Sequence, residues 1–337
     1  MGSWKELLDE FNNLPEAGKD GWWASQQRAS LEKIGLLRQD REVLLYGSAF
    51  LQKPTAPAFS VSIGAEDLNG LMAVVYQMDC SKGLTILLHT PGGSTNACET
   101  VVEYLRSKFD YIEVIVPAYA MSAGTMISLA ADRVIMGRQS QLGPIDPQIS
   151  TGSMTMSARA VVDQFRTARK DILGDGTTPA NPGAAHLWAP ILQSAGPSLL
   201  QEAQNALDYG ERMVAGWLGK YMLSGHPNPH DKALEIAKYF NDAGEHKSHG
   251  RRIGRDEARG AEVVVEDLED SQELQEAVLT SYHLATIAFD SGPLTKMLYA
   301  STGQMWARNL NIGAPPVPAT PQAPGRTVQP VPRKRQR

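Results

Sequence analysis

The chain has 337 residues, of which 42% are hydrophobic and 20% charged, a composition typical of a globular protein with one large or two medium-sized domains. Its net charge of -5 offers no electrostatic basis for binding nucleic acid. The two cysteines, Cys80 and Cys98, are too few for a disulfide scaffold and are not spaced as metal ligands are. They are consistent with a reducing compartment. We therefore expect no metal, no cofactor and no nucleic-acid partner.

Residues 1–40 are predicted to form a helical N-terminal extension, with Trp22 and Trp23 anchoring it to a core or to a neighbouring subunit. The first residues, MGSWKELLDEFNNL, lack the basic start and the apolar block of a secretion signal. We therefore expect a cytoplasmic protein.

Strand and helix patterns alternate along the next hundred residues. Short apolar runs predict strands at 41–50, 83–90, 112–119 and 132–137, with helical patterns between them at 64–78, 96–109 and 122–131. This alternation predicts an α/β fold with a parallel sheet. The uncharged run 114–131 has the minimum length of a membrane span, but it contains Pro117 and Gly124. We interpret it as a buried strand followed by a packed helix, not as a membrane span.

From residue 153 the pattern is mainly helical. Helices are predicted at 157–173, 198–223, 230–242 and 270–289, with a Gly-, Pro- and Ala-rich connection at 174–197 and a short helix leading into a strand at 255–268. We expect a helical insertion at about 153–223, a C-terminal helix, and a disordered proline-rich basic tail at 311–337.

Two loops that follow predicted strands combine the groups needed for acyl transfer. HTPGGS at 89–94 has a Gly-Gly pair that turns the backbone sharply and exposes N–H groups able to stabilise an oxyanion. YAMSAGT at 119–125 places Ser122 where a strand becomes a helix, and the N–H of Ala123 would be a second donor. Each motif alone has an ordinary interpretation, a turn or a helix cap, but the pair in this order is more specific.

These motifs carry a resemblance to a known family. The segments TILLHTPGGS, ETVVEYLRS and IEVIVPAYAMSAGTMISLAADRVIMGRQSQLGPIDPQI resemble Clp protease subunits and signal peptide peptidase A. Within that clan, they and FNDAGEHKSHGRRIGRDEARGAEV at 240–263 most resemble the serine dehydrogenase proteinase family. The resemblance covers roughly 41–150 and 215–290. It implies a ClpP/crotonase-like β-β-α superhelix over 41–310, with homo-oligomers that are rings or trimer-based.

The resemblance also implies the reaction and its residues. It implies that Ser122 is the nucleophile of a serine protease acting on peptide or protein substrates. Gly92, Gly93 and the N–H of Ala123 match the oxyanion and substrate-binding site. The general base departs from the family pattern. Where Clp-type subunits have a histidine, this chain has Asp146, and the family's aspartate falls near His249.

We therefore hypothesise that aspartate and histidine have exchanged positions, which gives Ser122, His249 and Asp146. A histidine is a suitable base near neutral pH. The segment EHKSHGRR could instead be a solvated loop, and Asp146 could simply hold a turn.

Other basic residues are also candidates for the base. Lys247 would serve if burial lowered its pKa, and His246 and Lys170 are further possibilities. Arg159 lies near the lysine position of signal peptide peptidase A, but a guanidinium is a poor base.

Two other functions remain open at this point. The same amide pair could polarise the carbonyl of an acyl thioester in a crotonase-like enzyme, for which Glu99 and Glu103 are the carboxylates to check. The chain could also be a non-catalytic assembly protein that keeps the fold. His89 is more consistent with packing than with catalysis. His226 and His230 lack the further ligands that a metal site needs.

Overall fold

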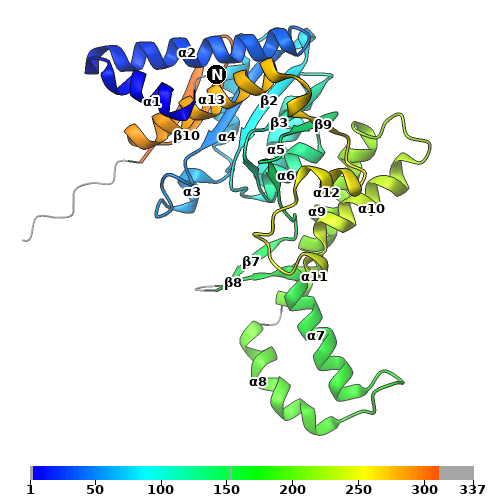
Figure 1. Ribbon diagram of the computed structural model, residues 1–337. Helices are drawn as coiled ribbons and strands as arrows, with labels where there is room; N and C mark the ends of the chain where they lie inside the picture. Colours follow the sequence, from blue (N-terminus) through cyan, green and yellow to red (C-terminus); the bar gives the residue numbers. More distant parts are fainter. Residues whose placement is uncertain (1–2, 152–153, 197, 311–337) are drawn as a thin grey trace, which may run out of the picture.

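The computed structural model describes residues 3–151, 154–196 and 198–310 (Figure 1). The tail predicted at 311–337 lies outside the described residues. A seven-stranded sheet has the order β11-β10-β1-β2-β3-β5-β9. Its strands are β1 (Glu42–Ser48), β2 (Leu84–His89), β3 (Ile112–Val116), β5 (Arg133–Met136), β9 (Val265–Asp267), β10 (Leu294–Ala300) and β11 (Met305–Asn309).

The centre of the sheet is parallel and covered on both faces. The strands β1, β2, β3, β5 and β9 run parallel, while β10 is antiparallel to both β1 and β11. Apolar runs such as LTILLH and IEVIV are typical of strands buried on both faces. Successive side chains point to opposite faces, so Leu44 and Tyr46 join one core cluster while Val43 and Leu45 join the other.

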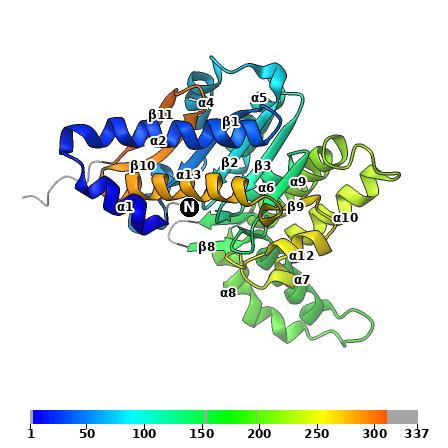
Figure 2. The same cartoon turned by 45° about the horizontal axis from the view of Figure 1, so that its top comes forward.

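One face is covered by helices from the two ends of the chain. The helices α2 (Glu16–Leu37) and α13 (Gln272–Ser291) lie side by side over it, with α1 (Trp4–Asn13) against them (Figure 2). The indole N–H of Trp23 donates to the carbonyl of Leu284 at 2.8 Å, and its ring packs edge-on against Tyr299. The N-terminal helices are therefore anchored to the core of their own chain.

The other face carries most of the remaining helices. They are α3 (Ala58–Val61), α4 (Asp67–Val75), α5 (Thr95–Arg106), α6 (Ala123–Leu129), α9 (Leu199–Lys220), α10 (Pro229–Asn241) and α12 (Arg255–Gly260), with the short 3-10 turns η1 (Cys80–Lys82) and η3 (Leu268–Asp270) in the connections. The short helix α11 (Ala243–His246) follows α10. The main apolar cluster includes Val101 of α5, Met126 of α6 and Phe240 of α10.

The segment from residue 148 to 220, part of which the sequence predicts to be a helical insertion, is only partly separate from this core. A two-stranded ribbon, β7 (Gln148–Thr151) and β8 (Met154–Ser157), leads into α7 (Ala158–Leu173), η2 (Pro182–Ala184) and α8 (Ala185–Ala195), which extend away from the sheet (Figure 1). The buried residues Val161 and Leu207 belong to a small cluster between α7 and α9. Val214 and Leu218, further along α9, belong to the main core.

The structure corrects three predicted elements. The strand expected at 112–119 is broken at Pro117, which cannot donate a ladder hydrogen bond, and the chain resumes as β4 (Tyr119–Ala120), paired with β6 (Gln141–Leu142). The connection at 174–197 contains α8, which accommodates Pro190. The hairpin β10–β11 extends the sheet although the sequence patterns predict no strand after residue 289.

No helix in the described ranges is both long enough and apolar enough to cross a bilayer. The uncharged run 114–131 is divided among β3, β4 and the seven-residue helix α6.

Candidate active site

Ser122 lies between β4 and α6, at the N-cap position of the helix. Its φ of 51° and ψ of -115° place a non-glycine residue in a sparsely populated conformation, at a cost of about 1–3 kcal/mol. Its side chain makes no capping hydrogen bond and is partly exposed. Ser122 therefore does not perform the usual role of a serine at this position, which is to accept a hydrogen bond from the first turn.

Two threonines hold the backbone that leads into Ser122. The N–H of Thr90 donates to the carbonyl of Tyr119 at 2.9 Å, and the N–H of Met121 donates back to the carbonyl of Thr90 at 3.1 Å. The hydroxyl of Thr125 donates to the carbonyl of Ala120 at 2.8 Å and accepts from the N–H of Gly143 at 2.9 Å. The sequence patterns mark neither threonine as a site residue, although both lie within the two motifs.

Gly92 packs directly against Ser122. A Cβ at this position would lie 2.7 Å from Ser122 Cβ and 3.1 Å from the nitrogen of Ala123, and the φ of +100° also favours glycine. The N–H of Gly92 donates to Thr90 Oγ1 at 3.2 Å. Gly92 therefore allows the backbone to approach Ser122 closely, but its N–H already donates a hydrogen bond to Thr90 and is not free for an oxyanion.

Two neighbouring amides are not engaged in this way. Within the part of the chain that the structure describes, the N–H groups of Gly93 and Ala123 donate no hydrogen bond. The carbonyl of Gly92 and the N–H of Ser94 both bond to Ile63, so the intervening N–H of Gly93 faces away from Ile63. Ala123 is the first residue of α6, where an N–H has no partner inside the helix.

Asp146 and His249 meet across two loops that are distant in sequence. Asp146 Oδ1 lies 2.7 Å from His249 Nδ1, and Asp146 Oδ2 accepts from Gln148 Nε2 at 2.8 Å. Asp146 is only 2% exposed, whereas the imidazole is 30% exposed. In a neutral imidazole, the hydrogen bond from Nδ1 to this carboxylate places the ring proton on Nδ1 and leaves the lone pair on Nε2. His249 Nε2 has no partner among the described residues.

Backbone pairing brings these loops together. Leu142 and Ile253 exchange two backbone hydrogen bonds of 2.9 Å each, and the N–H of Ile145 donates to the carbonyl of Phe240 at 2.8 Å. Gly143 follows Leu142, and a Cβ at Gly143 would lie 3.6 Å from the nitrogen of Ser122. The loop of Asp146 is thus joined to the loop of His249 at one point and lies against the Ser122 junction at another.

The other base candidates occupy different environments. Both ring nitrogens of His246 are engaged, Nε2 with the carbonyl of Tyr239 at 2.7 Å and Nδ1 with Arg251 at 2.8 Å. Lys247 is exposed, so the burial on which its use as a base depends is absent. Lys170 pairs with Asp175 at 2.9 Å in the last turn of α7. At 1.5 Å per residue, it lies roughly 16 Å along that helix from Arg159.

His89 is buried among aromatic rings. Its ring centroid lies 5.0 Å from those of Phe50 and Tyr282 and 6.1 Å from that of Tyr119. Neither ring nitrogen has a hydrogen-bond partner in the described chain, and burial lowers the pKa of His89 to about 3. His89 therefore remains neutral and packs as an aromatic residue, as its sequence context suggested.

The two glutamates expected in a thioester-processing site point elsewhere. Glu99 accepts a hydrogen bond from the hydroxyl of Tyr209 and so connects α5 to α9. Glu103 is exposed on α5. Cys98, on the same helix, is fully buried, and its Sγ lies 3.4 Å from the carbonyl of Ala123.

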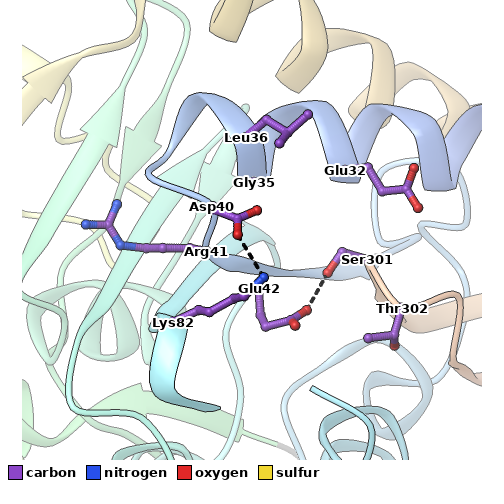
Figure 3. A pocket seen from close by; sticks show the side chains of 9 residues that line it. All are labelled: Glu32, Gly35, Leu36, Asp40, Arg41, Glu42, Lys82, Ser301 and Thr302. Carbon is purple, nitrogen blue, oxygen red and sulfur yellow. Dashed lines mark hydrogen bonds and ion pairs between the residues drawn. The ribbon is translucent and has the colours of Figure 1, made fainter. Parts of the chain in front are cut away.

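A hollow of about 360 Å³ lies at the opposite ends of the strands (Figure 3). Arg41 and Lys82 lie beside it and precede β1 and β2, whereas Ser122 lies beyond the carboxyl ends of the parallel strands. Lys82 pairs with Asp40 at 2.8 Å, and Glu42 accepts from Ser301 at 2.9 Å. Parallel α/β sheets place their chemistry at the carboxyl ends, so this hollow is not the candidate active site.

Part of the chain is similar to known proteins. Residues 56–177 match the family model described as ClpP-like SDH-type serine proteinase, a span that contains Ser122, Gly93 and Asp146 but ends before His249. Two uncharacterized proteins of Methanocaldococcus jannaschii are 39% and 37% identical to the chain over 87 residues, which are 26% of this chain and 30% of each relative. The chain thus matches less than a third of the length of these relatives.

Among solved structures, the chain is similar to a serine-to-alanine mutant of a membrane-bound stomatin-specific protease, with 22% identity, a TM-score of 0.25, and coverage of 32% of this chain and 55% of that one. The similarity to a family is given by the sequence match and not by this structural likeness. Residues 56–177 are thus similar to the ClpP-like SDH-type serine proteinases.

Proposed function

We propose that this protein is a serine peptidase that hydrolyses peptide bonds through an acyl-enzyme at Ser122. The single observation that carries the proposal is the conformation of Ser122, which is held at a positive φ against Gly92 with its hydroxyl free of any capping bond. A strained residue of this kind persists where the surrounding structure determines its position, and such residues cluster at functional sites.

In the first half of the proposed reaction, Ser122 Oγ attacks the carbonyl carbon of the substrate while His249 Nε2 accepts the hydroxyl proton. The N–H groups of Gly93 and Ala123 stabilise the oxyanion that develops on the carbonyl oxygen. The C–N bond then breaks, and His249 returns the proton to the leaving amine. Asp146 holds the imidazole in the tautomer that leaves Nε2 free to accept.

In the second half, water replaces the amine. His249 takes a proton from the water as its oxygen attacks the acyl carbon, and the same amides hold the second oxyanion. Collapse of that intermediate releases the carboxylate product and returns the proton to Ser122. The protein is thereby restored, and one water is consumed for each peptide bond cleaved.

The test is covalent labelling followed by turnover. A fluorophosphonate probe should modify the wild-type protein at Ser122, as located by peptide mass spectrometry, and should not modify Ser122→Ala. Ser107→Ala, which removes a hydroxyl at the end of α5, is the control and should label normally. Absence of labelling in the wild type, with no hydrolysis of unfolded casein, would contradict the proposal.

The same experiment separates the base candidates and the alternative functions. Loss of hydrolysis in His249→Ala with retention in Lys247→Ala would favour the imidazole, and the reverse result would favour the amine. Specific binding of an acyl-CoA would indicate a thioester enzyme. A defined homo-oligomer by light scattering, without labelling or turnover, would indicate an assembly protein. We propose a self-associating cytoplasmic peptidase and expect a ring or trimer-based species in the light-scattering measurement.

A further inference from the structure

A cavity of about 230 Å³ adjoins the Asp146–His249 pair. It lies between the first turn of α7 and the loop that carries His249. Its wall includes both members of the pair and four further side chains, Ser157, Arg159, Asp163 and Lys247. The cavity is therefore lined by the imidazole that we propose as the base and by two cations.

The anionic groups of this wall already have partners. Asp146 accepts from His249 and from Gln148. Asp163 pairs with Arg166 at 2.8 Å. Neither carboxylate is thus the ion-pair partner of a cation that faces the cavity.

The two cations have no such partner. Arg159 Nε is buried and has no hydrogen-bond partner, and neither Arg159 nor Lys247 forms an ion pair with any residue that the structure describes. Both cations line the cavity without an ion-pair partner, so the cavity is a place where an anion could bind. Arg159 is also the second residue of the sixteen-residue helix α7, whose N-terminus adds positive potential.

We propose that this cavity is a subsite for a carboxylate of the peptide substrate, bound by Arg159 and Lys247 next to the reacting bond. The inference rests on the proposed function, since it assigns the cavity to the same substrate. A guanidinium matches a carboxylate with two parallel hydrogen bonds, and a lysine ammonium adds a mobile second charge. The protein would accordingly prefer peptides that present an acidic group near the cleaved bond.

The carboxylate could belong to an aspartate or glutamate side chain, or to the C-terminus of the peptide. Two series of fluorescein-labelled hexapeptides built on alanine and leucine distinguish these sources. The first series ends in an amide and carries a single Asp, or Asn in its place, at each position in turn. The second has only neutral side chains and ends in either a free carboxylate or an amide.

Binding is measured by fluorescence anisotropy on Ser122→Ala, so that the result does not depend on turnover. We expect at least one peptide with a carboxylate to bind about 10- to 100-fold more tightly than its neutral counterpart, as expected for a charged hydrogen bond. Arg159→Gln should remove this preference and Arg159→Lys should restore part of it. Arg169→Gln, which removes an exposed arginine further along α7, should retain the preference in full.

Equal binding of charged and neutral peptides, or an undiminished preference in Arg159→Gln, would overturn the subsite. Thermal unfolding of each variant shows whether it is folded, and Lys247→Gln supplies a second variant outside α7. Labelling of Ser122 without any carboxylate preference would leave the proposed peptidase intact and reject the subsite alone. A preference that depends on Arg159 in a protein that never labels would support the subsite and reject the peptidase.

Discussion

His249 Nδ1 lies 2.7 Å from Asp146 Oδ1, although 103 residues separate the two in the chain. The two loops are joined by the Leu142–Ile253 bridge, so the pair is part of the folded framework. If His249 is the base, Asp146→Asn would favour the wrong tautomer and should lower kcat by about 10³- to 10⁴-fold. Steady-state hydrolysis of a peptide cleaved by the wild type measures this effect.

The control for that variant is Asp175→Asn, which removes an exposed carboxylate that pairs with Lys170. It should leave kcat unchanged. A wild-type kcat in Asp146→Asn would show that the carboxylate only holds its turn.

Gly92→Ala should inactivate the protein without removing any functional group. The added Cβ would lie 2.7 Å from Ser122 Cβ and from the carbonyl oxygen of Met121. Either the glycine loop or the serine junction must move, and displacements of about 1 Å can lower rates by about 100-fold. The measurement is kcat/KM together with the labelling rate at Ser122.

Gly21→Ala is the matched control, because no atom lies within 4 Å of the corresponding Cβ on α2. It should retain full activity. An active Gly92→Ala would mean that Gly92 and Ser122 are not held in close contact in solution.

The strained backbone of Ser122 predicts that glycine at this position gives a more stable protein than alanine, the reverse of their usual order. Glycine tolerates a positive φ and alanine does not, so Ser122→Gly should have a free energy of unfolding about 1–2 kcal/mol higher than Ser122→Ala. Urea denaturation of both inactive variants measures the difference. At Ser107, where φ is -74°, the order should be opposite, with alanine the more stable. The same order at both positions would argue against strain at Ser122.

Burial of His89 predicts a dependence of stability on acid. The pKa of His89 falls from 6.5 to about 3 in the folded protein, so the unfolded chain binds a proton between these values while the folded chain does not. Stability from this source is full above pH 6.5 and is lost as the pH falls towards 3. The loss between pH 7 and pH 5 is about 2 kcal/mol.

His89→Phe should therefore lose about 2 kcal/mol less than the wild type over that range. Urea denaturation at pH 7 and pH 5 provides the comparison. His186→Phe, at an exposed position on α8, should lose as much as the wild type. An equal loss in all three proteins would show that His89 is protonated within the folded protein.

Local patterns in the sequence were sufficient to predict the centre of this fold. The strands LTILLH and IEVIV are short and almost wholly apolar because both faces of a parallel sheet are covered, and that property is visible in the residues themselves. The places of Ser122 before a helix and of Gly93 after a strand could likewise be predicted, since a serine before a helix and a diglycine after a strand are local signals.

The hairpin β10–β11 and the helix α8 could not be found in this way. In β11, Trp306 and Arg308 are partly buried and alternate with more exposed neighbours, as in a strand with only one covered face. Over five residues this alternation is too weak a signal to predict a strand. The helix α8 contains Pro190 in a segment whose glycines and prolines are typical of a loop.

The sequence alone determined which residues could supply a nucleophile, amide donors and a base, because these depend on residue type and on neighbours within a few positions. Only the tertiary structure showed how the environments of these basic residues differ. It placed His249 on Asp146, engaged both nitrogens of His246, and left Lys170 at the far end of a helix. The physical reason is that contacts between residues a hundred positions apart are set by the packing of the sheet and its loops, which no local pattern records.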